Sequence, residues 1–243
     1  LVELLLKKKY NIFVIDNLST GRKENISKFA NKIKFLNADI SVIGTWTKIM
    51  KKIDIVYHLA ALADIVPSIQ NPNKYFKANV IGTQNILDQC IKYNVKKVIY
   101  TASSSCYGIP NNYPTTESEI INPKYPYALT KKIGEDLLLH YNKIFKLKAV
   151  SLRLFNVYGT KSRTSGTYGA MFGVFLAQKI AKVPYTMVGD GSQSRDFTYV
   201  EDIASAVYTS VFSDTKNEIF NVGSGKTIKI NYLADLIQDK RVY

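Results

Sequence analysis

The chain has 243 residues, of which 46% are hydrophobic and 21% charged, the balance of a folded globular protein with a substantial core. No run of about 18 apolar residues occurs, so the sequence does not predict a membrane-spanning helix. The opening LVELLLKKKY places its lysines after the apolar stretch, the reverse of a secretory signal. A cytoplasmic protein without membrane association is predicted.

The net charge of +14 is carried mainly by lysines dispersed along the predicted helices and turns. They form neither an aromatic–basic repeat nor a basic tail, so no nucleic-acid partner is predicted. The positive potential favours a small acidic ligand through long-range attraction. Cys90 and Cys106 lack the spacing of a disulfide or of metal ligands, so we expect two buried thiols and no metal site.

Through the first 159 residues, apolar runs of strand length alternate with longer stretches of helical period. The predicted elements are a helix over 1–9, strands over 11–16, 33–40 and 54–60, a helix over 75–93, a strand over 96–103, a helix over 127–145 and a strand over 149–159. Apolar strands separated by amphipathic helices indicate a parallel sheet covered on both faces. We therefore predict an α/β fold with a doubly wound, Rossmann-like sheet.

The alternation loosens in the C-terminal third of the chain. The patterns predict a loop over 159–169, a helix over 171–182, a short strand over 183–189, a turn over 189–194 and a helix over 200–212. We interpret 1–158 as the domain that forms the sheet and 159–243 as a smaller cap region with interleaved segments. The cap is expected to pack at the carboxyl ends of the strands.

Both ends of the chain are unusual for this fold. A doubly wound sheet that binds a dinucleotide begins with a central strand and a glycine-rich turn, whose N–H groups face the pyrophosphate. Here the first predicted element is the helix over 1–9. We therefore expect the chain to be incomplete at both ends. The absent first strand would lie between the strands over 11–16 and 54–60, whose edges are left unpaired.

Tyr127 and Lys131 carry the strongest chemical signal. They are four residues apart on a predicted helix, so both side chains lie on one face. At roughly 5 Å and an effective dielectric near 20, the ammonium would favour the phenolate by about 3 kcal/mol, which suits a general base. Ser103 ends the preceding strand, where its hydroxyl could share a proton with Tyr127. Serine at a strand end is also an ordinary turn former.

Two further residues, Asp16 and His58, can be interpreted from their position at the ends of predicted strands. Asp16 ends the strand over 11–16, where a carboxylate can accept both hydroxyls of an adenosine ribose and would repel a 2′-phosphate. This favours NAD over NADP. His58 also lies at a strand end, and we interpret it as a hydrogen-bonded structural side chain rather than a catalyst.

The motifs DNLSTG, NADI, YHLAALAD, NVIGTQNIL, SSSCYG, YPYALTK, LRLFNVYG and GDGSQSRDFTYVEDIA follow one another along nearly the whole chain. In this order they resemble the extended short-chain dehydrogenases/reductases, the NAD-dependent epimerase/dehydratase family. The resemblance implies NAD as cofactor and a nucleotide-sugar substrate. It also implies a homodimer formed through the helices over 75–93 and 127–145.

The resemblance further implies roles for single residues. Tyr127 would be the base, Lys131 its electrostatic partner and ligand of the nicotinamide ribose, and Ser103 the partner of the reacting oxygen. The implied NAD site contains Asp16, Asn17, Leu18, Ser19, Thr20, Gly21, Asp39, Ile40, Leu59, Ala60, Ala61, Asn79, Tyr127, Lys131 and Phe155. The implied substrate site contains Ser103, Ser104, Tyr127, Asn156 and Arg195. A structural alternative for Arg195 is an ion pair with Asp196 or Glu201.

The residues after Ser103 bear on the reaction. Related 4,6-dehydratases have Asp-Glu there, and UDP-glucuronate decarboxylases carry a Glu shortly after the same position, whereas this chain has Ser104 and Ser105. We therefore predict a UDP-hexose 4-epimerase, resembling the enzymes for UDP-glucose or UDP-N-acetylglucosamine, that acts through a 4-keto intermediate with tightly bound NAD. The decarboxylase, the dehydratase and a non-catalytic scaffold remain alternatives. The segment ALADIVPSI differs from the basic loop of some galactose-pathway epimerases, so the sugar stays open.

Overall fold

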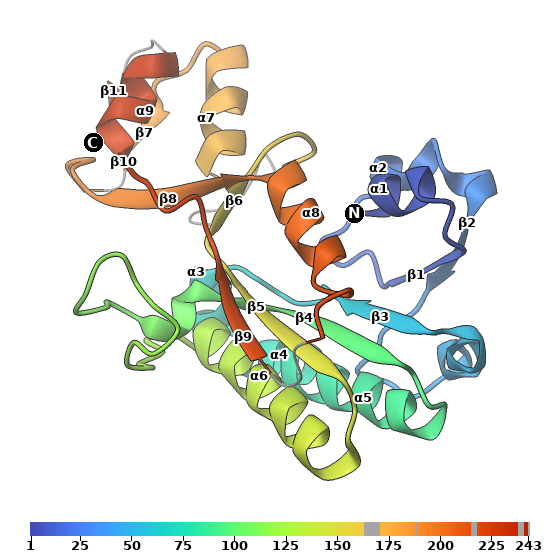
Figure 1. Cartoon of the computed structure of the whole chain (residues 1–243). Helices are drawn as coiled ribbons and strands as arrows, with labels where there is room; N and C mark the ends of the chain where they lie inside the picture. The colour runs from blue at the N-terminus through green and yellow to red at the C-terminus, as the bar shows by residue number, and fades with distance from the viewer. Residues whose placement is uncertain (163–170, 188, 215–217, 238–240, 243) are drawn as a thin grey trace.

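The computed structural model describes residues 1–162, 171–187, 189–214, 218–237 and 241–242. Strands side by side form a central layer, with long helices beneath it and a smaller lobe above its carboxyl end (Figure 1). The predicted loop over 159–169 lies largely outside the described residues. The predicted α/β class is confirmed.

The main sheet is parallel throughout. Its order is β3 (Ile55–His58), β4 (Lys97–Ser103), β5 (Ala149–Leu154) and β9 (Glu218–Val222). Every residue of β4 is buried, which explains its continuous apolar pattern, because both faces of the strand are covered. Its last residue, Ser103, pairs in register with Leu154, so the serine lies at the carboxyl edge of the sheet.

A second, two-stranded parallel sheet consists of β1 (Ile12–Asp16) and β2 (Ile33–Asn37). Within the described residues no ladder joins β1 to β3, in line with the two unpaired edges that the sequence predicts. Asp16 pairs with Asn37, so the acidic end of β1 faces the same way as the end of β2.

One face of the main sheet is covered by a nearly continuous helix and by α6 (Pro126–Phe145). The continuous helix comprises α4 (Pro72–Phe76), a π-helical turn η3 (Lys77–Ile81) and α5 (Gly82–Lys92). Proline begins both α4 and α6, where its missing N–H is not needed. These helices share one core cluster with the strands, which includes Leu87, Val98 and Leu138.

The opposite face is covered by α8 (Val200–Thr209), and α1 (Val2–Lys7) packs beside α8 and on β1. Ile203 and Val207 of α8 pack with buried side chains of β4 and β5. Lys97 extends from β4 and donates to the carbonyls of Ser210, Val211 and Ser213, at 2.9, 3.1 and 2.6 Å. A cation at the C-terminal end of a helix complements the helix dipole, so Lys97 anchors α8 to the sheet.

The smaller lobe has its own core around Phe175, Tyr185 and Leu233. Its sheet contains β6 (Asn156–Tyr158), β8 (Ser194–Tyr199) and β10 (Thr227–Lys229). The other elements of this lobe are α7 (Met171–Ile180), β7 (Tyr185–Thr186), α9 (Ile230–Ile237) and β11 (Arg241–Val242). The domain boundary at residue 158 stays a prediction.

The strand predicted over 149–159 is divided at Phe155. The main-chain N–H of Phe155 still donates to Val222 in the main sheet, but the following residues pair with β8 instead. The remaining short elements are α2 (Glu24–Ser27), η1 (Ala30–Lys32), η2 (Thr45–Lys52), α3 (Ile65–Gln70) and η4 (Ser104–Tyr107).

Cys90 and Cys106 are both buried thiols, as predicted. In the described part of the chain, no helix combines the length and apolar character needed to cross a membrane.

Candidate active site

Ser103 and Tyr127 meet at the carboxyl edge of the main sheet. Ser103 ends β4 and is 9% exposed, while Tyr127 lies in the first turn of α6. The Ser103 hydroxyl lies close enough to the Tyr127 phenol to oppose the rise in its pKa that burial causes. The structure therefore brings together two of the three predicted catalytic residues without any spacing signal that links them in the sequence.

A second serine hydroxyl belongs to this cluster. The hydroxyls of Ser103 and Ser105 share a hydrogen bond of 2.8 Å, and the Ser105 N–H donates to Ser103 Oγ at 3.2 Å. Ser104 lies between them in η4. The predicted substrate site contains Ser104 rather than Ser105. Two serines two residues apart in a short 3-10 turn have no periodic pattern that would predict the contact between their hydroxyls.

Lys131 lies one turn after Tyr127 and is only 3% exposed. Its Nζ lies 4.3 Å from the ring centroid of Tyr100. Burial lowers the pKa of Lys131 to about 7, and the negative charge of Glu135 opposes that change. The ammonium is thus held inside the protein by an aromatic face and a carboxylate.

The pKa of Tyr127 differs from the sequence expectation. Loss of hydration raises the pKa of Tyr127 above its usual value, the Ser103 hydrogen bond lowers it, and the Asp64 carboxylate raises it again. The expectation that Lys131 brings the phenol toward neutrality is therefore wrong for this structure. The physical reason is that desolvation of Tyr127 dominates, while the Lys131 ammonium lies over Tyr100.

Glu135 connects the site to the sheet beneath it. Its carboxylate accepts from Arg153 Nε at 3.0 Å and from Arg153 Nη2 at 2.6 Å, and from the Ser151 hydroxyl at 2.8 Å. Arg153 also donates to the Tyr107 hydroxyl at 2.7 Å, just beyond the serine turn. All these side chains are fully or nearly fully buried, so the network orders α6 and η4 relative to β5.

The predicted ribose-binding turn follows β1. Asp16 Oδ1 accepts from the Leu18 N–H at 2.7 Å, and Leu18 adopts a left-handed φ of 56°. A Cβ at Gly21 would lie 2.8 Å from Asp16 Oδ2, so only glycine allows the turn to approach the carboxylate so closely. Asn17 is hydrogen-bonded to Asp39, which links the ends of β1 and β2.

Asp39 is itself held in a tight turn, since its Oδ1 accepts from the Ser41 N–H at 2.8 Å and from the Ser41 hydroxyl at 2.7 Å. Ile40 is buried and would meet a Cβ at Gly82, so α5 packs directly on this turn. Ser19 and Thr20 complete the turn after β1. The predicted cofactor residues of β1 and β2 therefore form one cluster at the carboxyl ends of those strands.

The remaining predicted cofactor residues lie around the ends of β3 and β5. Leu59, Ala60 and Ala61 follow β3 directly, and Leu59 is 47% exposed. Asn79, in the π-helical turn, accepts from the Leu62 N–H and donates to the Leu62 carbonyl and to Thr130 Oγ1.

Thr130 donates in turn to the Tyr127 carbonyl. Asn79 therefore positions the loop after β3 against the N-terminal turn of α6, and π-helical turns often occur at functional sites.

The predicted phosphate-binding residues lie on the cap. Asn156 donates to the Asp196 carbonyl at 2.9 Å, and Arg195 donates through Nη1 to the neighbouring Ser194 carbonyl. The Asp196 carboxylate instead accepts from Ser224 and Gly225. Arg195 thus forms no ion pair with Asp196 in this structure, and its guanidinium lies in the exposed part of β8.

His58 is a buried structural residue, as the sequence analysis interprets it. Its Nε2 lies 2.8 Å from Thr83 Oγ1, and Thr83 donates its own proton to the Asn79 carbonyl. Burial lowers the pKa of His58 to about 3, and the charge of Lys131 adds to this effect. The ring is therefore neutral, with Nε2 as the donor.

The residues present fit a bound NAD in one respect that the structure shows directly. The Asp16 carboxylate is partly exposed at the carboxyl end of β1, where the following turn approaches it closely, and a carboxylate there suits two ribose hydroxyls. A doubly wound sheet with Ser103, Tyr127 and Lys131 at that edge defines an NAD-dependent protein of the short-chain dehydrogenase/reductase type.

The chain belongs to the NAD dependent epimerase/dehydratase family, whose model matches residues 1–223. A putative UDP-glucose 4-epimerase of Methanocaldococcus jannaschii is 37% identical over 240 residues, which cover 98% of this chain and 77% of that protein. A protein of Arabidopsis thaliana named UDP-glucuronic acid decarboxylase 4 is 30% identical over 244 residues, which cover 98% of this chain and 54% of that protein.

Solved structures agree with this membership. A UDP-N-acetylglucosamine 4-epimerase of Methanobrevibacter ruminantium in complex with UDP-N-acetylmuramic acid has a TM-score of 0.89 at 36% identity, over 96% of this chain and 76% of the other. A Thermus thermophilus UDP-glucose 4-epimerase in complex with NAD has a TM-score of 0.88 at 29% identity, over 100% of this chain and 80% of the other. NAD is the cofactor of this family.

Proposed function

We propose that this protein interconverts UDP-hexoses by epimerisation at C4 of the sugar. The observation that carries the proposal is that the Ser103 hydroxyl and the Tyr127 phenol lie together at the end of β4, with Lys131 one turn further along α6. A phenol and a serine hydroxyl that lie close together can both reach one sugar hydroxyl and share its proton.

In this mechanism the chain contributes proton transfer and orientation. Tyr127 removes the proton of the 4-hydroxyl, Ser103 relays it, and Lys131 would hold the nicotinamide ribose of bound NAD. When bound, NAD would accept the hydride from C4 and return it, which makes a 4-keto sugar the proposed intermediate. Asp16, Asp39, Leu59 through Ala61 and Asn79 would hold NAD at the carboxyl edge.

Epimerisation requires the keto sugar to present both faces to the same site. Binding energy is therefore best placed on the nucleotide diphosphate and withheld from the sugar ring. Asn156 and the exposed Arg195 guanidinium on the cap are the residues that we assign to the diphosphate, since an arginine fork suits its oxygens.

The immediate surroundings of Ser103 favour epimerisation over elimination. Ser104 and Ser105 offer hydroxyls where elimination would need a carboxylic acid and a carboxylate, and Ser105 is already hydrogen-bonded to Ser103. Hydroxyls at this position can orient a sugar oxygen but cannot remove water from it at neutral pH.

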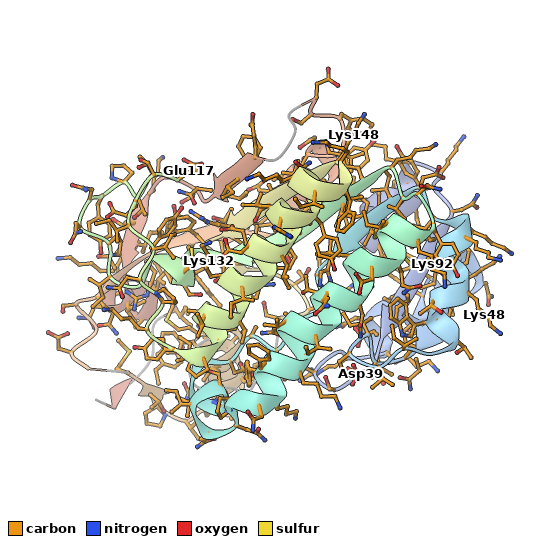
Figure 2. The ribbon with its side chains drawn as sticks, turned by 90° about the horizontal axis from the view of Figure 1, so that it is seen from below. Asp39, Lys48, Lys92, Glu117, Lys132 and Lys148 are labelled. Atoms are coloured by element: carbon orange, nitrogen blue, oxygen red, sulfur yellow. The ribbon has the colours of Figure 1, made fainter. Side chains whose placement is uncertain are left out.

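We further propose that the protein forms a homodimer through the helical face of the main sheet. Figure 2 shows α5 and α6 side by side on this face, with Lys92 on α5 and Lys132 on α6. Phe76 at the end of α4 and Leu129 in α6 are 45% and 47% exposed, an unusual exposure for large apolar side chains on neighbouring helices.

The proposed activity is tested with the full chain, UDP-glucose, UDP-galactose and the two N-acetylated forms. Interconversion without added reductant is expected for at least one pair. Tyr127→Phe, which keeps the ring but removes the proton, should lower kcat at least 100-fold with little change in KM. Loss of carbon dioxide from UDP-glucuronate, with no conversion of any of the four UDP-hexoses, would identify the decarboxylase instead.

A further inference from the structure

Tyr100 contacts Lys131 in two different ways. It lies in the middle of β4 and is fully buried, and its hydroxyl donates to the main-chain carbonyl of Lys131 at 3.2 Å. Its ring face also lies 4.3 Å from Lys131 Nζ. A single side chain thus holds both the backbone and the ammonium of the same lysine.

The position of this ring is fixed from both sides. A Cβ at Gly134 would lie only 2.3 Å from the Tyr100 hydroxyl oxygen, so α6 has a glycine where Tyr100 passes beneath it. On the other side, the ring of His58 packs on Tyr100 with centroids 5.4 Å apart. Neither α6 nor β3 leaves Tyr100 another place to lie.

The Lys131 ammonium needs a partner that stabilises its charge, because the side chain is buried and no longer hydrated. The titratable groups around it are Tyr127 and Glu135 on α6, Tyr100 on β4 and His58 on β3. His58 is neutral, and the carboxylate of Glu135 is already bonded at both oxygens by Arg153. The Glu135 charge favours the ammonium, and the face of Tyr100, whose ring centroid lies 4.3 Å from Nζ, favours it by direct contact.

We propose that Tyr100 is the positioning residue for Lys131: its ring keeps the buried ammonium charged and in place over the aromatic face, and its hydroxyl fixes the α6 backbone. The part of this inference that concerns turnover rests on the proposed function, because Lys131 is assigned there to the nicotinamide ribose. The part that concerns the charge of Lys131 does not depend on any activity.

The charge of Lys131 is tested first. Lysine labelled with carbon-13 at Cε reports the titration of each ammonium by NMR, and the Lys131→Arg spectrum identifies the signal. Tyr100→Phe retains the ring, whereas Tyr100→Leu removes it. We expect the pKa of Lys131 to fall by about one pH unit in Tyr100→Leu and to change little in Tyr100→Phe.

A fluorinated series separates this effect from loss of packing. Phenylalanines with one to five ring fluorines at position 100 keep the shape of the side chain while weakening the negative ring face. A stepwise fall in the pKa of Lys131 along the series supports the proposal even if Tyr100→Leu fails to fold. A pKa that stays constant along the series would overturn it.

Turnover gives the second readout. In an active enzyme, Tyr100→Leu should lower kcat about 10-fold at neutral pH and move the alkaline limb of the rate profile to lower pH, with KM changed less than about threefold, and Tyr100→Phe should restore both. Equal loss of kcat in both variants at every pH would contradict a role through the ring. If the wild type converts no UDP-hexose, the proposed function fails while the NMR titration still decides the role of Tyr100.

Discussion

His58 provides a sharp test at the scale of single residues, because the chain has only two histidines. Its Nε2 donates to Thr83, and burial lowers its pKa to about 3. We expect its imidazole nitrogen shifts to show the neutral Nε2–H tautomer from pH 8 to pH 5. An imidazolium signal from His58 within this range would contradict the assigned hydrogen bonds.

The same residue makes stability depend on pH with a definite sign. Between about pH 6.5 and 3 the unfolded chain binds a proton at His58 that the folded protein does not bind. Stability is therefore lost as the pH falls, by up to about 1.4 kcal/mol for each pH unit. His58→Asn, whose amide can still donate to Thr83, should flatten the denaturation free energy measured between pH 6.5 and 5.

For single residues, the sequence predicts which side chains are candidates for catalysis better than it predicts which side chains contact them. The spacing of Tyr127 and Lys131 predicts their common helix face, and the strand end predicts Ser103. The partners of Lys131 come from other elements: Tyr100 lies in a different strand, and its contact with Lys131 depends on how α6 packs on β4. Glu135 follows Lys131 by one helical turn, and that spacing could have revealed it.

Among the elements, α6 carries a testable exception to helix propensity. Alanine normally stabilises a helix interior by about 1 kcal/mol relative to glycine. At Gly134, however, a Cβ would lie 2.3 Å from the hydroxyl oxygen of Tyr100 and 2.9 Å from its ring carbon Cζ. We expect Gly134→Ala to destabilise the protein by about 1–2 kcal/mol, measured by urea denaturation, because overpacking outweighs propensity.

A double-mutant cycle identifies the cause of that destabilisation. Tyr100→Phe removes the hydroxyl oxygen that the new methyl group would approach most closely. Combined with Gly134→Ala, it should recover part of the lost stability, which gives a coupling energy of about 1 kcal/mol. Additive effects of the two substitutions would mean that the contact in α6 is looser than the structure shows.

The elements also show where periodicity succeeds and fails. The strands β3 and β4 and the helices α5, α6 and α8 are predicted, because each has a long apolar pattern and neighbours of similar kind. The strands β8 and β9 are missed. β8 begins with polar residues, of which Ser194 and Arg195 are exposed, and β9 joins the main sheet only after the chain has returned from the cap.

At the scale of the whole molecule, the proposed dimer can be tested on the helical face. Leu129→Glu places a carboxylate on the proposed contact surface, where dimer formation would bury it without a hydrogen-bonding partner. We expect the wild type to show twice the chain mass of 27.4 kDa by light scattering, and Leu129→Glu to weaken the dimer at least 100-fold.

The matched control lies on the cap. Ile180 at the end of α7 is 84% exposed, so Ile180→Glu makes the same change of charge and polarity on a surface outside the helical face. This variant should remain dimeric.

Phe76→Glu, from the neighbouring helix, should behave like Leu129→Glu, because both side chains border the same surface. A monomeric wild type, or a dimer that tolerates both helix substitutions but not Ile180→Glu, would place the contact elsewhere. In that second case the cap, which we assign to the diphosphate, would also be the surface through which two copies of the chain meet.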